Sequence, residues 1–238
     1  MNFKEKNAIF CALDMKDTDL AVSFTKSIID YIDGVKIGME GFYSMGIDGY
    51  NRIQDLNLPI FLDLKLHDIP NTVNSAIKSL LPLKPFMLNV HVTGGAEMMV
   101  SAKQAVEESK NEKPLLVGVT ILTSMNENSF KEQGLKLNIG NQVTNLANLA
   151  MKSGLNGVVC SPHEARKVKD MCGEDFLTVV PGIRPQTSGS QDQKRIMTPK
   201  EAVKNGADIL IIGRPLTRSK DPISAAKEIR MSIENNDN

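Results

Sequence analysis

The segment FLDLKLHDIPNT, residues 61–72, carries the clearest fold signal in the sequence. Together with Ile60 it begins as a nearly continuous apolar run, which is typical of a parallel strand buried on both faces. Asp63 and Lys65 interrupt this run, and residues two apart on a strand point to the same side. We therefore expect a carboxylate and an ammonium group side by side near the end of the strand, before Pro70 forbids a further sheet hydrogen bond.

Two interpretations of Asp63 and Lys65 are open. The pair can be a structural salt bridge at the junction of strand and loop, although buried ion pairs rarely return their desolvation cost as stability. It can also belong to a functional site, because such sites concentrate buried, perturbed charges. The polar residues in the rest of the chain favour the functional interpretation.

The alternation of strand-like and helix-like segments extends along the whole chain. Apolar, strand-like runs occupy residues 8–14, 34–39, 60–66, 87–93, 115–122, 157–160, 177–183 and 209–214. Eight strands, each followed by a helix, in 238 residues predict a (β/α)8 TIM barrel. A doubly wound open sheet is the alternative, but no G-x-G-x-x-G motif follows the first strand. We expect a single domain over residues 1–238, with a core of about residues 7–234 and a short disordered C-terminal tail.

Two four-residue segments have the pattern of a helix start. SPHE, residues 161–164, predicts Ser161 as the N-cap with Glu164 reaching back to it. TPKE, residues 198–201, has the same pattern and predicts a second capping box.

Composition argues against several function classes. Lysine and arginine number 28, as do aspartate and glutamate, so the net charge is +0 and nothing indicates a nucleic-acid or membrane surface. The N-terminal segment has no apolar core with a cleavage site, so we expect no secretion signal. Cys11, Cys160 and Cys172 have unrelated spacings and are interpreted as buried thiols in a reducing cytoplasm.

Charged residues lie where the active site of such a barrel is expected, at the carboxyl ends of the strands. Asp14 ends the first strand, Lys36 lies in the second, and Asp63 and Lys65 end the third with Asp68 just beyond. Three adjacent strands thus carry charges of alternating sign to one mouth of the barrel. Chance explains any one of these positions but not all of them.

The last two strands indicate a phosphate site. Barrels often bind phosphate with the loops after strands seven and eight, and here those strands end in Gly182-Ile183-Arg184 and Gly213-Arg214. A glycine lets a ligand approach the backbone N–H groups, and an arginine can bind phosphate with two hydrogen bonds. Arg214 alone would be interpreted as a surface residue; the pair of arginines favours phosphate.

The motifs now described resemble those of the orotidine 5′-phosphate decarboxylase family, in its bacterial type. The most specific is DLKLHDIPNT, residues 63–72, and the resemblance covers nearly the whole chain. The other motifs, in family order, are Asp14, GVKIG with Lys36, TILTS (120–124), PGIRP (181–185), Asp192-Gln193 and IGRP (212–215). The resemblance implies a cytoplasmic enzyme that converts orotidine 5′-monophosphate to uridine 5′-monophosphate in de novo pyrimidine biosynthesis.

The resemblance also implies a homodimer whose active sites are shared. Asp63, Lys65 and Asp68 of the partner subunit would surround C6 of the pyrimidine. Lys36 would complete the charge network and, with Asp14, hold the ribose hydroxyl groups. No metal or cofactor is implied, so Lys65 itself would stabilise the carbanion formed at C6 and supply its proton.

Further residues would complete the pocket. Thr72 of the partner subunit would help to hold the ribose, and Ile69 of the partner subunit would wall the site. Thr123 and Ser124 would lie near the base. The phosphate would be bound by Arg184, Gln193, Gly213 and Arg214.

Two other functions remain open. Metal-dependent sugar-phosphate decarboxylases and aldolases of the same superfamily share the D-x-K-x-x-D pattern of residues 63–68, but they need an acidic residue where this chain has Lys36, and a cation disfavours a divalent metal. A non-enzymatic nucleotide-binding barrel would keep the phosphate site without needing alternating buried charges. His67 and His91 are interpreted as structural histidines.

Overall fold

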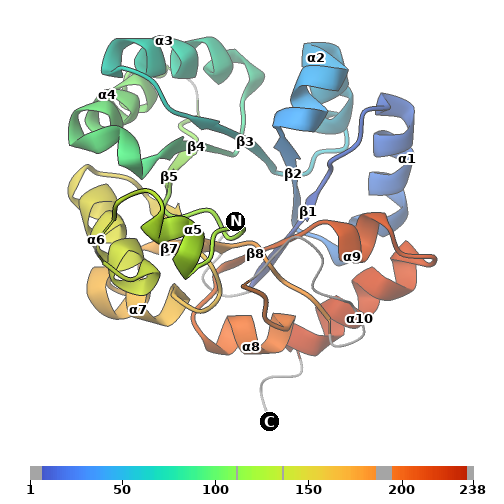
Figure 1. Cartoon of the computed structure of the whole chain (residues 1–238). Coiled ribbons are helices and arrows are strands. Elements are labelled where there is room, and N and C mark those ends of the chain that lie inside the picture. Colours follow the sequence, from blue (N-terminus) through green and yellow to red (C-terminus); the bar gives the residue numbers. More distant parts are fainter. Residues whose placement is uncertain (1–6, 111, 136, 186–194, 235–238) are drawn as a thin grey trace.

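The computed structural model describes residues 7–110, 112–135, 137–185 and 195–234. Within these residues, eight parallel strands close into a barrel in their sequence order (Figure 1). The strands are β1 (Ala8–Ala12), β2 (Gly34–Gly38), β3 (Ile60–Leu66), β4 (Met87–His91), β5 (Leu115–Val119), β6 (Gly157–Val159), β7 (Leu177–Val180) and β8 (Ile209–Ile212). The predicted (β/α)8 TIM barrel is confirmed, and the strands end up to three residues before the apolar runs do.

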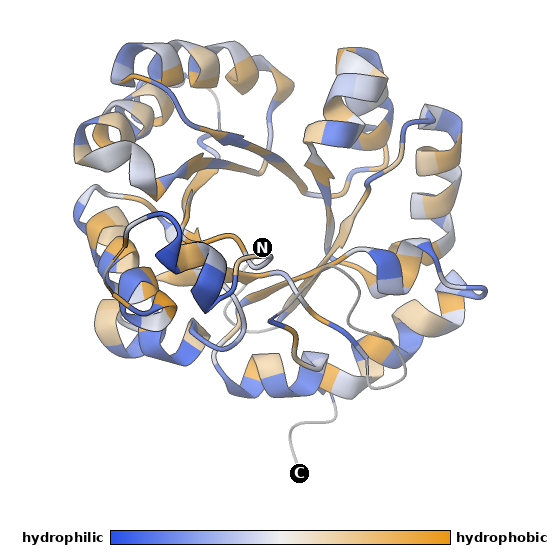
Figure 2. Ribbon diagram, in the orientation of Figure 1, coloured by the Kyte–Doolittle hydropathy of each residue, from blue (hydrophilic) through white to orange (hydrophobic). Residues whose placement is uncertain are grey.

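Helices surround the barrel and turn their apolar sides toward it (Figures 1 and 2). The α-helices are α1 (Thr18–Ile28), α2 (Met39–Gln54), α3 (Pro70–Leu80), α4 (Gly95–Glu107), α5 (Glu127–Lys131), α6 (Ile139–Lys152), α7 (Ala165–Cys172), α8 (Pro199–Lys204), α9 (Arg214–Thr217) and α10 (Pro222–Glu234). Short 3₁₀ turns are η1 (Ile29–Tyr31), η2 (Leu81–Leu83) and η3 (Val92–Gly94). Among the described helices, none has the length and apolarity needed to cross a bilayer.

The strands are buried on both faces, as the continuous apolar runs predict. Residues at alternate positions, such as Phe10, Phe61 and Met87, form an apolar cluster made of strand residues inside the barrel. The intervening positions, such as Cys11 and Leu62, pack with the helices in a separate, larger core. Inward and outward positions therefore alternate along each strand.

The inward positions change from apolar to polar as the strands approach their carboxyl ends. Phe61 on β3 is followed two residues later by Asp63, and Met87 on β4 by Asn89. On β2, Lys36 is paired in register with Phe61, and its ammonium group contacts the Asp63 carboxylate. This change places a polar layer directly above the apolar interior of the barrel.

The pairing of β3 with β4 contains an irregularity at this polar layer. Leu62 pairs with Leu88 and Leu66 pairs with Val90, so β3 uses four residue steps where β4 uses two. Lys65 lies within this bulge and has a φ of 54°, a left-handed conformation that is rare for residues other than glycine.

One predicted helix start is wrong and the other is confirmed. Residues 161–164 form a turn, and α7 begins at Ala165 with no side-chain cap. Glu164 does not reach back to Ser161, because its carboxylate forms a buried ion pair with Arg195, at 2.8 Å. At α8 the capping box is present: Thr198 accepts a hydrogen bond from the backbone of Glu201, whose side chain accepts from the backbone of Thr198.

The three cysteines are free thiols. Cys11 and Cys160 are buried, as predicted, whereas Cys172 is only partly buried. Burial raises the pKa of the Cys11 thiol to about 12, so this group stays protonated at neutral pH. The predicted disordered tail, residues 235–238, lies outside the described residues.

Candidate active site

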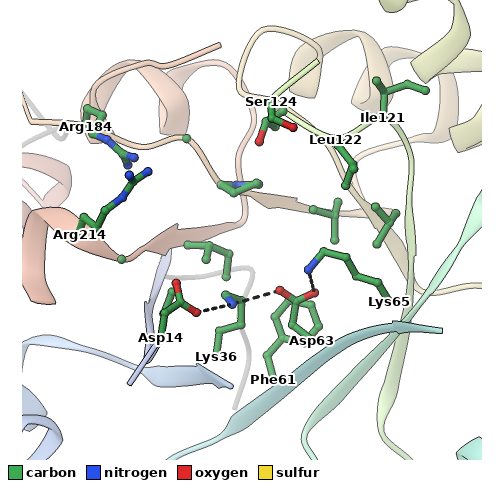
Figure 3. Close-up of a pocket in the computed structure, with 18 residues that line it drawn as sticks. Asp14, Lys36, Phe61, Asp63, Lys65, Ile121, Leu122, Ser124, Arg184 and Arg214 are labelled. Carbon is green, nitrogen blue, oxygen red and sulfur yellow. Dashed lines mark hydrogen bonds and ion pairs between the residues drawn. The ribbon is translucent and has the colours of Figure 1, made fainter. Parts of the chain in front are cut away.

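A pocket of about 280 Å³ opens at the carboxyl ends of the strands. It lies at the mouth of the barrel where the sequence predicts the active site. Figure 3 shows Asp14, which follows β1, with Lys36 of β2 and Asp63 and Lys65 of β3 on one side, and Arg184 and Arg214 on the other. The predicted residues that line the pocket are Asp14, Lys36, Asp63, Lys65, Thr123, Ser124, Arg184, Gly213 and Arg214.

Four of these residues form a continuous row of alternating charge. The ammonium group of Lys36 lies 3.6 Å from Asp14 Oδ1 and 3.1 Å from Asp63 Oδ2. Lys65 Nζ donates a hydrogen bond of 2.8 Å to the other oxygen, Asp63 Oδ1. Asp63 is therefore held between two lysines, and four of the five charged residues that the sequence predicts for this row, Asp14–Lys36–Asp63–Lys65, are brought together, whereas Asp68 is not part of the row within its own chain.

The two central members of the row are held in their charged forms. Burial alone would raise the pKa of the Asp63 carboxyl group, but Lys36 and Lys65 outweigh this effect and lower that pKa below its ordinary value. Burial alone would lower the pKa of Lys36, but Asp63 and Asp14 raise it above its ordinary value. The pocket therefore contains fixed charges at neutral pH. The ammonium group of Lys65 forms the last member of the row.

A fifth polar residue, which the sequence interpretation missed, lies beneath the row. Asn89 on β4 is 1% exposed and donates a hydrogen bond of 2.6 Å to Asp63 Oδ1. Its side-chain oxygen accepts a hydrogen bond of 2.8 Å from the backbone N–H of Lys65. The available signal was an amide residue at an inward position of the otherwise apolar segment MLNV.

The opposite side of the pocket is positively charged. Arg184 follows β7 and is buried, and Arg214 is the first residue of α9 after β8. The guanidinium groups of the two arginines point toward one another in Figure 3. Gly182, with a φ of 81°, precedes this segment and lines the same part of the pocket. Two converging guanidinium groups form a site suited to a phosphate group.

The segment after β5 forms a third side. Ile121, Leu122, Thr123 and Ser124 all line the pocket, so it combines apolar surface with hydroxyl groups. Arg195 supports this segment from outside, because its guanidinium group donates to the carbonyl oxygen of Ile121 at 3.5 Å.

Three predicted residues do not line the pocket of their own chain. Asp68, Ile69 and Thr72 lie on the surface between the end of β3 and the first turn of α3, and Ile69 is 66% exposed. The Asp68 carboxylate accepts a hydrogen bond from the backbone N–H of Ile69. A fourth predicted residue, Gln193, lies outside the described residues.

The two histidines lie beside the row rather than in the pocket lining. The rings of His67 and His91 are 5.3 Å apart between centroids. Burial, followed by the neighbouring charges of His67 and Lys65, lowers the pKa of His91. His91 is therefore neutral at pH 7.

The donor set of the pocket does not suit a divalent metal. Among the described residues, no group of three or more histidine, cysteine, aspartate or glutamate side chains is arranged to hold a metal ion. Asp63 is already bound by two ammonium groups, which would repel a metal cation at the same carboxylate.

Comparison with known proteins adds an independent line of observation. Residues 7–229 match the family model described as orotidine 5′-phosphate decarboxylase / HUMPS family. A protein named orotidine 5′-phosphate decarboxylase from Actinobacillus pleuropneumoniae serotype 5b (strain L20) is 43% identical over 227 residues, covering 95% of this chain and 99% of that protein. Another of that name, from Pseudoalteromonas translucida (strain TAC 125), is 44% identical over 234 residues, covering 98% of this chain and 100% of that protein.

A solved structure agrees in fold as well as in sequence. The crystal structure of orotidine 5′-phosphate decarboxylase from Lactobacillus acidophilus matches with a TM-score of 0.82 and 36% identity, covering 96% of this chain and 99% of that one. The family match extends over nearly the whole chain and includes every strand of the barrel. The chain therefore belongs to the orotidine 5′-phosphate decarboxylase / HUMPS family.

Proposed function

We propose that this protein decarboxylates orotidine 5′-monophosphate to uridine 5′-monophosphate, as a step of pyrimidine biosynthesis, without a metal or cofactor. The observation that carries the proposal is the row Asp14–Lys36–Asp63–Lys65, which faces two arginines across one pocket. The names of the full-length relatives support the choice of substrate.

Loss of CO2 from C6 of orotidylate leaves a carbanion with little delocalisation and no built-in electron sink. Many decarboxylases obtain such a sink from a cofactor. In this proposal, the ammonium group of Lys65 lies beside C6, where it stabilises the developing negative charge and then donates a proton to the carbon. The new C–H bond forms as the lysine becomes a neutral amine, which is reprotonated from solvent after product release.

Asp63 has two roles in this proposal. It fixes Lys65 through the 2.8 Å hydrogen bond, and its negative charge lies on the side from which CO2 departs. Lys36 keeps Asp63 ionised in its buried position and, with Asp14, presents polar groups to the ribose. Because these charges are in place before substrate binds, they need little reorganisation during the reaction.

The phosphate group would be bound far from the reacting carbon, by Arg184 and Arg214 with the backbone at Gly213. Gln193 is assigned to the same subsite from the family motif. Binding energy from a remote group can be used to desolvate and orient the reacting part of the substrate. Thr123 and Ser124 would then contact the base on the third side of the pocket.

A metal-dependent sugar-phosphate decarboxylase or aldolase is the second candidate, and a nucleotide-binding barrel without activity is the third. Release of CO2 from orotidylate, measured before and after exhaustive dialysis against a chelator, separates all three. Our proposal expects equal rates in both preparations. A rate that disappears with the chelator and returns with magnesium would favour the metal-dependent relatives, and tight nucleotide binding without CO2 release would favour the binding protein.

We also propose that the protein acts as a homodimer with shared active sites. Asp68, Ile69 and Thr72 occupy an exposed edge at the start of α3, outside their own pocket, and an exposed isoleucine beside a carboxylate is suited to contact with a second copy. In a two-fold dimer the contact is reciprocal, so each chain would contribute these three residues to the pocket of the other.

A further inference from the structure

Asn89 occupies a place in the barrel where an apolar residue would be expected. It lies on β4 two residues after Met87, which belongs to the apolar barrel interior, and it is 1% exposed. A buried amide group that leaves its donors or acceptor unpaired is costly. The Asn89 side chain has one hydrogen-bond partner for its NH2 group and one for its oxygen. Both partners belong to the proposed catalytic pair Asp63 and Lys65.

The bulge in β3 explains why a side chain is needed here. Between Leu62 and Leu66 the regular ladder with β4 is interrupted, so the backbone N–H of Lys65 requires a partner other than the usual strand carbonyl. The Asn89 oxygen accepts that N–H at 2.8 Å. This bond holds Lys65 in its left-handed conformation, with a φ of 54°, which costs free energy for a residue with a side chain.

The other end of the amide fixes the carboxylate. The Asn89 nitrogen donates to Asp63 Oδ1 at 2.6 Å, and the same oxygen accepts from Lys65 Nζ at 2.8 Å. An N–H can only donate and an ionised carboxylate can only accept, so the residue between them must offer one acceptor and one donor. Asparagine does so, whereas an aspartate at this position would lack the donor while it is ionised.

We propose that Asn89 is a positioning residue that holds the backbone of Lys65 and the carboxylate of Asp63 in a fixed relative geometry. In this geometry the ammonium group of Lys65 points at the reacting carbon. The inference rests on the proposed decarboxylase function. Among the described residues, the pocket lining does not include Asn89, so we assign this residue no direct contact with the substrate. Its removal should therefore lower kcat while the affinity for product changes little.

The first test is Asn89→Ala, with Asn156→Ala as the matched control. Asn156 also uses its side-chain oxygen to accept a backbone N–H of a strand, that of Leu116 at 2.9 Å, but it lies at the opposite end of the barrel. Loss of hydrogen bonds to a charged group predicts a kcat lower by about 10- to 100-fold for Asn89→Ala. The dissociation constant of uridine 5′-monophosphate should change less than about threefold, and Asn156→Ala should keep the wild-type kcat.

The second test, Asn89→Asp, keeps the shape of the side chain and adds a readout that a structural role would not produce. The new carboxyl group takes the place of an amide that contacts Asp63 and Lys65 on β3. Lys36 on β2 also interacts with Asp63, and His91 on β4 interacts with Asp63, Lys65 and His67. Once protonated, the new carboxyl group can again donate to Asp63 and accept from the Lys65 N–H. The ratio of variant to wild-type kcat should therefore rise as the pH falls, by up to about tenfold per pH unit.

A third readout needs no substrate. The rate at which an amine-directed reagent labels Lys65, followed by peptide mass spectrometry, should rise severalfold in Asn89→Ala and stay unchanged in Asn156→Ala. If wild-type protein releases no CO2 from orotidylate, the proposed function fails, and this labelling rate still tests the placement of Lys65. If Asn89→Ala does not fold, the pH profile of Asn89→Asp decides.

Three kinetic results would each contradict the positioning role. These are a wild-type kcat in folded Asn89→Ala, an equal loss of kcat in Asn156→Ala, and a ratio for Asn89→Asp that does not change with pH. Unchanged labelling of Lys65 in Asn89→Ala would contradict it as well.

Discussion

At the scale of single residues, Arg214 gives the clearest separation of binding from chemistry. It contacts the part of the pocket assigned to phosphate, opposite Lys65 (Figure 3). We expect Arg214→Ala to raise KM by about 10- to 100-fold and to change kcat less, because a charged hydrogen bond far from the reacting carbon is lost. Steady-state kinetics check this, with Arg218→Ala, an exposed arginine at the end of α9, as the control. An unchanged KM would place the phosphate elsewhere.

Asp63 predicts how stability depends on pH. Its pKa in the folded protein lies below that of an unfolded aspartate, so its ionisation contributes stability that is present above about pH 4 and is lost as the pH falls through the folded pKa. The difference in free energy of unfolding between wild type and Asp63→Asn should therefore shift in favour of the variant as the pH falls below about 4. Urea unfolding at several pH values checks this.

The control for this series is Asp55→Asn, at an exposed position at the end of α2, which removes the same charge. A difference between wild type and Asp63→Asn that stays constant from pH 7 to pH 3 would show that the carboxylate is not held in its ionised form by its neighbours.

The row of charges was predictable from the sequence because it depends on strand parity and on the order of the strands. Asp63 and Lys65 are two residues apart, and Lys36 lies on the neighbouring strand. Asn89 was not predictable in the same way, because its partners become visible only when the bulge in β3 leaves the Lys65 N–H opposite an amide side chain. The assignments of Asp68, Ile69 and Thr72 to a neighbouring pocket stay predictions, since one chain cannot test them.

At the scale of elements, Gly34 shows how tightly β2 packs against the barrel interior. A Cβ atom at Gly34 would lie 2.5 Å from the Phe10 ring and 2.7 Å from the carbonyl oxygen of Pro59. We expect Gly34→Ala to lower the free energy of unfolding by about 1–3 kcal/mol, as for an overpacked core. In α6, a Cβ atom at Gly140 would lie 3.6 Å from its nearest neighbours, Asn138 Oδ1 and Lys167 Nζ. Gly140→Ala should therefore leave the free energy of unfolding unchanged or raise it by up to about 1 kcal/mol.

Urea unfolding of both glycine variants measures these free energies. An equal change in the free energy of unfolding for the two substitutions would mean that the lack of space around Gly34 is not what requires a glycine there.

The sequence predicted well those elements that depend on interactions between residues close together in the chain. The apolar runs located all eight described strands, and the capping box at α8 involves residues three apart. The start of α7 was mispredicted because Glu164 pairs with Arg195, 31 residues away in the sequence. The short helices α5 and α9 were not predicted, since segments of four or five residues carry little periodicity.

At the scale of the whole molecule, an active site shared between two chains predicts that two inactive variants can restore activity when they are mixed. Lys65→Ala and Asp68→Ala homodimers should both be severely impaired. When subunits exchange at random, about half of the dimers are mixed, and each mixed dimer has one pocket with both native residues. Activity should therefore return to about a quarter of the wild-type level.

Mass spectrometry of the mixture confirms subunit exchange, and a mixture of Lys65→Ala with Asp63→Ala serves as the control, because those two residues belong to the same pocket. Exchange without recovery of activity would mean that Asp68 acts within its own chain.

In the proposed mechanism, Lys65, held by Asp63, carries the decarboxylation. The decisive experiment measures kcat for orotidine 5′-monophosphate and the dissociation constant of uridine 5′-monophosphate in Lys65→Ala. Lys78→Ala, at an exposed position on α3, is the control. We predict a fall in kcat of at least about 10³-fold, because electrostatic stabilisation and proton donation are lost together, while product affinity changes less than about tenfold. A kcat near the wild-type value in Lys65→Ala would show that Lys65 does not carry the reaction.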